Sequence, residues 1–153
     1  MEEIKQTIEE FLGLLEDEMS SVEENETQLR LLCDKLVYQI QISIFAIDDA
    51  EYITPPERSY NKIETVVYEK FPNLGNYNIA EFVSYEVGKI GISVENAIED
   101  ISEIAKQLYE IRWRFHNTSS NDALWHLSNS YKTGLERNFR NLQYYLFYRS
   151  IKE

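Results

Sequence analysis

Apolar residues recur at steps of three and four along most of the chain, a spacing that gathers them on one face of an α-helix. This pattern predicts helices over residues 2–19, 26–49, 55–71, 94–116 and 121–149. Short polar connections join several of them, and short connections place successive helices antiparallel. We therefore expect an all-α fold, an up-and-down array of about five helices, built as a single helical domain over residues 1–153.

Capping residues set the predicted helix boundaries. Asn25, followed by Gln28 at the capping-box position, predicts the start of the second helix. Thr54-Pro55-Pro56-Glu57 combines a cap, a proline at the first helical position and an acid in the first turn, which predicts the third helix. Ser93 is the expected cap of the fourth helix, and Gly134 is expected to bend the last helix or to allow close packing.

Residues 72–93 carry many apolar side chains without a sustained period. Gly88 and Gly91 argue against one long helix here, because glycine destabilises a helix interior. We expect an irregular packed segment over 72–93, with either a short helix or an extended loop between residues 77 and 93. A long irregular segment in a compact domain is usually either functional or a misread element.

The sole cysteine, Cys33, lies among Leu29, Leu32 and Leu36 on an apolar helical stripe. One cysteine excludes a disulfide within the chain and a four-thiolate zinc site. We expect Cys33 to be a small buried core residue, because no base stands near it in the sequence to make it a nucleophile.

The net charge of −12 is concentrated at the N-terminal end. Residues 1–26 hold ten acids and one lysine, whereas residues 117–153 hold three acids and five bases. An acidic surface repels nucleic acid and anionic membranes and attracts basic partners. We therefore expect no nucleic acid and no membrane among the partners. Solubility, or attraction between the two ends of the chain, is the alternative explanation for this charge.

Two features of the sequence bear on localisation. The N-terminus is acidic where a signal peptide would be basic. The most apolar run, residues 37–46, is interrupted by Gln39, Gln41 and Ser43 and is too short to cross a bilayer. We therefore expect a cytoplasmic protein.

Candidate chemistry gathers at a polar hinge over residues 116–122, between the last two predicted helices. His116 and His126 flank this hinge and Asp122 could join them, but two histidines do not make a zinc site. We expect no metal and no cofactor. Arg112 and His116 suggest the phosphate-holding arginine and acid–base histidine of helical ribonucleases, although too few residues separate them. An all-helical hydrolase or nuclease-like enzyme using Arg112, His116, Asp122 and His126 is the alternative function.

Glu95, Glu99 and Glu103 follow one another at four-residue spacing on the fourth predicted helix. Carboxylates at that spacing can share a divalent metal in a helical bundle. Di-iron sites also need Glu-x-x-His, which neither histidine of the chain provides. The pattern therefore favours a solvated acidic face.

Residues 144–148, Tyr-Tyr-Leu-Phe-Tyr, place aromatic side chains all round the end of the last helix. One helix face cannot bury all of them, so some must be exposed or must cover another segment. Exposed aromatic residues rimmed by polar groups are typical of protein interfaces. A partner surface is one prediction, and coverage by the N-terminal helix is the other.

Three stretches carry a family resemblance: Tyr60-Asn-Lys-Ile-Glu-Thr-Val-Val and on to residue 77, residues 93–106, and Asp122-Ala-Leu-Trp125 and on to residue 142. The second of these is a serine-capped acidic helix that includes Glu99, Asp100 and Lys106. In these features the chain resembles the bacterial family called "domain of unknown function 5063". That family opens its acidic helix with two adjacent acids, where this chain has Asn96 and Ala97. The resemblance implies an all-helical fold and no particular activity.

Taken together, these features favour a non-enzymatic acidic protein-interaction domain. We expect a bacterial immunity protein that binds and neutralises a basic toxin domain, with electrostatic steering to speed the capture of this basic protein partner. The acids at the end of the first helix and after the second lie close together if these helices are antiparallel. The expected contacts are Glu16, Asp17, Glu18, Glu23, Glu24, Asp48, Asp49, Glu51, Tyr144 and Tyr148.

Overall fold

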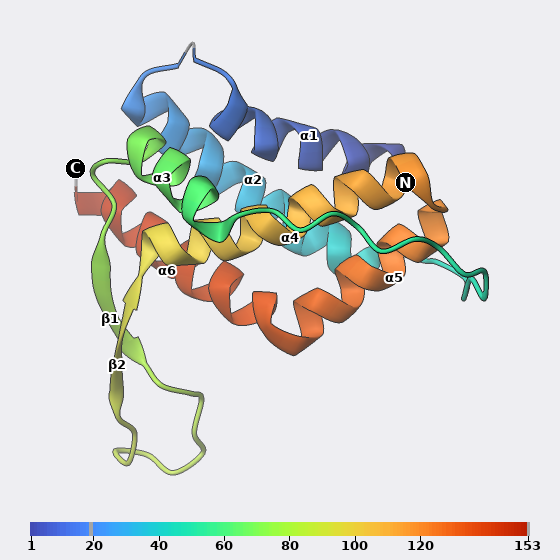
Figure 1. Cartoon of the computed structure of the whole chain (residues 1–153). Coiled ribbons are helices and arrows are strands. Elements are labelled where there is room, and N and C mark those ends of the chain that lie inside the picture. The colour runs from blue at the N-terminus through green and yellow to red at the C-terminus, as the bar shows by residue number, and fades with distance from the viewer. Residues whose placement is uncertain (19, 153) are drawn as a thin grey trace.

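A computed structural model describes residues 1–18 and 20–152 of the chain. Its helices are α1 (Glu2–Glu16), α2 (Val22–Ile42), α3 (Tyr60–Lys70), α4 (Ala97–Asn117), α5 (Ser120–Ser130), η1 (Tyr131–Leu135, a π-helical turn) and α6 (Glu136–Lys152), and its strands are β1 (Asn76–Ala80) and β2 (Ile92–Asn96). The structure is 67% helical, and the helices form an up-and-down array (Figure 1). The predicted all-α fold is therefore confirmed, with one small sheet added. Among the described helices, none has the length and apolar content required to span a membrane.

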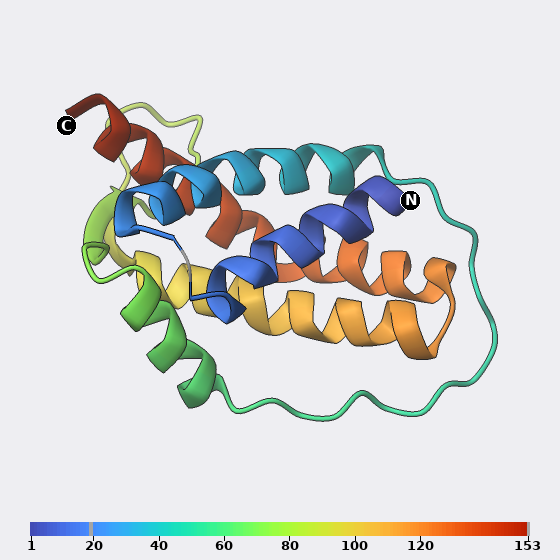
Figure 2. The ribbon, with the colours of Figure 1, turned by 90° about the horizontal axis from the view of Figure 1, so that it is seen from above.

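The helix α4 lies at the centre of the fold and contacts α1, α3, α5 and α6. Its buried apolar positions recur every three or four residues: Ala97, Ile98, Ile101, Ile104, Ala105, Leu108 and Ile111. Burying each isoleucine or leucine stabilises the fold by roughly 1.5–3 kcal/mol. The helix α2 packs against α1 and α6 and completes the same core (Figure 2).

The helix α1 ends at Glu16 rather than at predicted residue 19, which lies outside the described residues. The start of α2 lies one turn before the predicted one. Ser21 and Glu24 form a capping box: the Glu24 N–H donates to Ser21 Oγ at 3.2 Å, and the Ser21 N–H donates to Glu24 Oε2 at 3.3 Å. Serine with glutamate three residues later matches the capping-box pattern better than Asn25 with Gln28. Asn25 is instead buried, so the predicted cap is wrong.

The end of α2 also differs from the prediction, because the helix stops at Ile42 and not at residue 49. Residues 43–59 form an extended strap in which Ile44 and Ile47 are 90% and 79% exposed. The spacing of these isoleucines is helical, but both side chains face solvent. An unburied apolar stripe does little to sustain a helix, since most helical stability comes from tertiary packing.

The helix α3 begins at Tyr60 rather than at residue 55. Its cap is Ser59, whose hydroxyl accepts a hydrogen bond from the Lys62 N–H at 3.4 Å. The predicted start, Thr54-Pro55-Pro56-Glu57, belongs to the strap. Each proline favours extended backbone in the residue before it, and two in succession prolong the extended chain.

A β-hairpin occupies much of the segment predicted to be irregular. Its strands pair antiparallel, in a register that runs from Asn76 opposite Asn96 to Ala80 opposite Ile92. Outside the strands, the segment consists of a short turn before β1, residues 72–75, and a loop, residues 81–91. The loop is exposed rather than packed: Val83 and Val87 are 94% and 98% exposed. The loop is longer than the roughly two- to five-residue turns that mark a hairpin in a sequence.

The pairing of β2 also moves the start of α4 from residue 94 to Ala97. Ser93, the predicted cap, lies within β2. The cap is Asn96, whose side-chain oxygen accepts hydrogen bonds from the N–H groups of Ile98 at 2.8 Å and Glu99 at 3.3 Å. Asparagine is among the strongest N-cap residues.

The last predicted helix, residues 121–149, is built of three parts. The helix α5 ends at Ser130, the turn η1 contains Gly134, and α6 continues to Lys152. The chain changes direction where these parts meet (Figure 1). A π-helical turn is a recognised cause of a helix kink, so the predicted bend at Gly134 is confirmed.

Cys33 is fully buried, as predicted. Burial raises the pKa of its thiol. A thiol in such surroundings supplies little of the thiolate that a nucleophile needs, so Cys33 serves as a core residue.

We expect Ser21→Ala to lower the free energy of unfolding by about 1 kcal/mol, because the N–H of Glu24 loses its acceptor. Ser20→Ala is the matched control, since Ser20 is exposed and lies outside the helix. The control should change stability by less than about 0.5 kcal/mol. Urea unfolding at neutral pH measures both variants, and equal effects would contradict the assignment of the cap.

Candidate functional site

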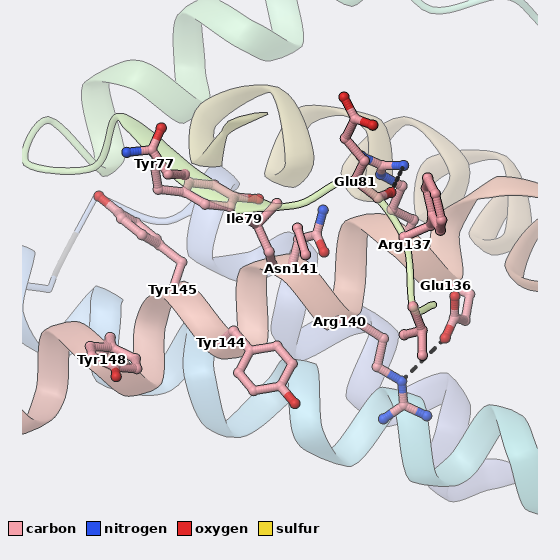
Figure 3. A pocket seen from close by; sticks show the side chains of 14 residues that line it. Tyr77, Ile79, Glu81, Glu136, Arg137, Arg140, Asn141, Tyr144, Tyr145 and Tyr148 are labelled. Carbon is pink, nitrogen blue, oxygen red and sulfur yellow. Dashed lines mark hydrogen bonds and ion pairs between the residues drawn. The ribbon is translucent and has the colours of Figure 1, made fainter. Parts of the chain in front are cut away.

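An open groove of about 950 Å³ lies between the hairpin and α6. One wall is formed by residues 77–83, which are β1 and the start of the loop. The other wall is formed by side chains of α6: Glu136, Arg137, Arg140, Asn141, Tyr144, Tyr145 and Tyr148. Figure 3 shows the tyrosines of both walls in this groove, which we call the aromatic groove.

The α6 wall carries the aromatic cluster that the sequence singled out. Tyr144 and Tyr148 lie four residues apart and are 66% and 58% exposed, and the neighbouring Phe147 is 50% exposed. These side chains are therefore exposed and not covered by the N-terminal helix. Tyr145 turns inward and stacks on Tyr77 of β1, with ring centroids 4.8 Å apart.

Hydrogen bonds fix the hairpin against the helices. The Tyr77 hydroxyl donates to the carboxylate of Asp100 on α4, which also accepts from Asn138 Nδ2 on α6 at 2.9 Å. The Gly75 N–H donates to the Tyr145 hydroxyl at 3.1 Å. These bonds join β1, α4 and α6, so the two walls of the groove share one anchor.

Asp100 is 3% exposed although its side chain is ionisable. Burial raises the pKa of this carboxyl to about 6, against the opposing effect of the hydrogen bonds from Tyr77 and Asn138. Burial and the bond to Asp100 raise the pKa of the Tyr77 phenol. In the sequence, Asp100 stands three residues after Ala97 and next to Ile101, both of which are buried on α4, and this position is the signal that marks it as buried.

The two arginines on the walls of the groove are paired with acids. Arg137 contacts Glu95 of β2 at 2.7 Å and donates to the Glu81 carbonyl at 3.0 Å, and Arg140 contacts Glu136 at 3.4 Å. Tyrosines and paired charges give a wall suited to binding. The lining residues include no histidine, cysteine, serine or lysine.

Two of the three glutamates predicted to form a solvated face on the fourth helix do so. Glu99 and Glu103 are exposed on α4. Glu95 lies on β2 instead, where it accepts a hydrogen bond from the Ser93 hydroxyl at 2.7 Å. The hydrogen bond from Ser93, and next the hydrogen bond and charge of Arg137, lower the pKa of Glu95 against the opposing effect of burial.

The acids at the end of α1 and the start of α2 lie together at one end of the molecule. Asp17, Glu18 and Glu23 are exposed there. Glu16 forms an ion pair with Arg112 of α4 at 2.8 Å, and Glu24 is engaged in the capping box. Part of the predicted contact set is therefore free for a partner, and part serves the fold.

Asp48, Asp49 and Glu51 lie on the strap at the opposite end (Figure 2). Ser119, the residue just before α5, donates a hydrogen bond from its hydroxyl to Asp48. This bond, and next the bond from Tyr52, lower the pKa of Asp48. Antiparallel packing places the end of α1 beside the start of α2, not beside its end. The expectation that the two acidic groups adjoin is therefore wrong.

Arg112 and His116 lie on the face of α4 that meets α1. Arg112 contacts Glu9 at 3.3 Å and Glu16 at 2.8 Å. His116 lines a hollow of about 350 Å³ beside it. With two carboxylates on its guanidinium, Arg112 is engaged in holding α1 and α4 together rather than poised for a phosphate.

Asp122 and His126 lie near Arg114 rather than near the glutamates of α1. Asp122 pairs with the buried Arg114 at 3.0 Å, and His126 Nε2 lies 3.5 Å from Asp122 Oδ1. Burial, and next the charge of Arg114, lower the pKa of His126. The four residues proposed for an enzyme thus form two pairs with separate partners. Residues 1–18 and 20–152 contain no group of three or more His, Cys, Asp or Glu placed to hold a metal ion.

Comparison with protein-family models, curated proteins and solved structures finds no match for this chain. The resemblance to domain of unknown function 5063 therefore stays a prediction.

We expect the stability of Asp100→Asn, relative to the natural chain, to rise between pH 5 and pH 8. The folded pKa of about 6 lies above the ordinary value of 3.8. The folded state therefore holds an extra proton, and the natural chain loses stability as the pH rises through this range. Asparagine cannot ionise, so the difference in unfolding free energy should grow in its favour by about 1 kcal/mol.

Urea unfolding at both pH values measures this difference. Glu103→Gln is the matched control, because Glu103 is an exposed carboxyl on the same helix. Its difference from the natural chain should stay nearly constant. Parallel stability profiles for Asp100→Asn and the natural chain would contradict the burial of a titrating carboxyl at this position.

Proposed function

We propose that this chain is a non-enzymatic interaction domain for a basic protein partner, and within that class an immunity protein that binds and neutralises a basic toxin domain. The observation that carries the proposal is the aromatic groove with its exposed tyrosines, Tyr144 and Tyr148. Tyrosine is enriched at protein interfaces, where its ring buries apolar area and its hydroxyl keeps a polar partner.

Exposed apolar side chains of the hairpin loop add to this surface: Phe82 and Val83 line the groove, and Tyr85 lies outside its lining. On the loop, Phe82, Val83 and Tyr85 are 58%, 94% and 102% exposed. Apolar area of this kind is costly to leave in water, at roughly 25 cal/mol per Å². Exposed apolar side chains gathered on one loop therefore support a surface that a partner covers.

The charge of the chain supports a basic partner. Glu18 and Glu23 are exposed, and the net charge is −12. Arg149 of α6 pairs with Glu26 at 3.1 Å, so attraction between the ends of the chain uses part of the N-terminal acidity. The remaining exposed acids would steer a cationic partner and raise its association rate.

The alternative, a helical hydrolase or nuclease-like enzyme at the hinge, has weaker support. It requires Arg112, His116, Asp122 and His126 to act on one substrate. Arg112 is held by two glutamates on one side of α4, and Asp122 is held by Arg114 on another. Electrostatic repulsion of RNA by the acidic chain adds to this objection.

The test uses a basic polypeptide captured from cells of the native host by the intact chain. We expect Tyr144→Ser with Tyr148→Ser to weaken its binding by about tenfold or more, because central tyrosines carry much of the energy of an interface. Glu18→Lys with Glu23→Lys should mainly slow association and reduce its dependence on salt. Surface plasmon resonance separates the two effects.

Tyr68→Ser is the control for the tyrosine variant, since Tyr68 is 62% exposed on α3, outside the groove. It should leave the affinity unchanged. Tight binding of a cationic partner that survives both the tyrosine and the charge substitutions would refute the proposal. Failure to capture any basic polypeptide would refute it as well.

A further inference from the structure

The hairpin wall of the aromatic groove is the edge of a strand rather than the face of a sheet. The sheet has two strands, and in the described part of the chain β1 pairs only with β2. The groove is lined by every residue from 77 to 83 in succession, and by none of β2. Side chains alternate between the two faces of a strand, so an unbroken run of lining residues indicates that its backbone borders the groove.

The pattern of hydrogen bonds between the two strands identifies the backbone groups that point outward. The Glu81 N–H donates to the Gly91 carbonyl at 3.1 Å, and the Ala97 N–H donates to the Gly75 carbonyl at 3.0 Å. In an antiparallel pair, residues alternate between bonding the partner strand and pointing away from it. With the observed register, residues 77 and 79 bond inward, and Asn78 and Ala80 direct their N–H and C=O groups outward.

These outward groups are available. Asn78 and Ala80 are exposed, and within residues 1–18 and 20–152 no hydrogen bond is made by their N–H groups on that side. An open strand edge is a template for pairing with another extended chain. Here the facing wall is α6, with the exposed rings of Tyr144 and Tyr148 (Figure 3).

We propose that the groove binds an extended segment of the partner, which joins the free edge of β1 as a third strand. The inference rests on the proposed function and specifies how the partner is held. Backbone bonds to Asn78 and Ala80 would supply affinity that is independent of sequence. Every second side chain of the segment would lie against Tyr144 and Tyr148, and these contacts would supply specificity.

Charge complementarity points to a segment of another protein that alternates apolar and basic residues. The arginines of the groove walls are already paired with Glu95 and Glu136, whereas Glu81 is the first residue after β1 and is exposed. A second copy of the chain is disfavoured as the occupant, because it brings another net charge of −12 to the same edge.

The experiment selects random twelve-residue peptides, displayed on phage, on the intact chain. The peptide that binds best is then synthesised as the probe. Asn78→Pro removes an outward N–H without removing a bond to β2, so it should weaken probe binding by about tenfold or more. Val94→Pro is the matched control. Val94 lies opposite Asn78, so its N–H and C=O groups point away from β1, toward the outer edge of β2. It should keep the affinity within about twofold.

Amide hydrogen exchange of the natural chain gives a second readout that needs no variant. The amides of Tyr77 and Ile79 should be protected in the free chain. Those of Asn78 and Ala80 should exchange quickly in the free chain and slow by about tenfold or more when the probe binds. Circular dichroism checks that both proline variants keep the helical fold.

Several outcomes would overturn the inference. One is that no peptide is enriched over an unrelated bait, and another is that the probe binds Asn78→Pro and the natural chain equally. Probes lost in the Tyr144→Ser variant but retained by Asn78→Pro would show groove binding without strand pairing, which leaves the proposed function intact. Protection of Asn78 and Ala80 in a dimer of the free chain, seen by light scattering, would identify a second copy as the occupant instead.

Discussion

Asp100 is a buried carboxyl on α4 to which the hairpin and α6 are both tied. Tyr77 donates one hydrogen bond to it from β1, and Asn138 donates another from α6 at 2.9 Å. A buried polar group that loses its partner costs roughly 1–3 kcal/mol, so each element is held by the others. The separation of β1 from α6 follows from this shared anchor, and with it the aromatic groove.

Tyr144 and Tyr148 are exposed because only a narrow face of α6 packs into the core. Phe139, Leu142 and Leu146 form the narrow stripe that α6 buries. Steps of three and four cover one face of a helix, and the remaining circumference stays outside. Tyr144 and Tyr148 lie on that remainder, beside a hairpin that is fixed without covering them. Folding and binding thus use different faces of the same helix.

Periodicity predicted which helices exist, because a stripe such as that of α4 is buried along its whole length. Periodicity failed at the ends of the helices. Ile44 and Ile47 keep the helical spacing, but both are exposed and lie after the end of α2. The exposure of Tyr144 and Tyr148 was predictable, since one face cannot bury the aromatics of residues 144–148. The free edge of β1 was not predictable from the sequence. A strand has a free edge only once its other edge has paired, and here that pairing with β2 spans a long loop.

The π-helical turn η1 has a consequence for the geometry of α6 as a whole. An α-helix advances by about 100° per residue, and a π-turn accommodates one residue more than the α-helical ladder. The turn therefore sets the angular phase of α6 relative to α5. Without that extra residue, α6 would be rotated by about 100° about its axis. Phe139 would then leave the core, and Tyr144 and Tyr148 would face away from β1.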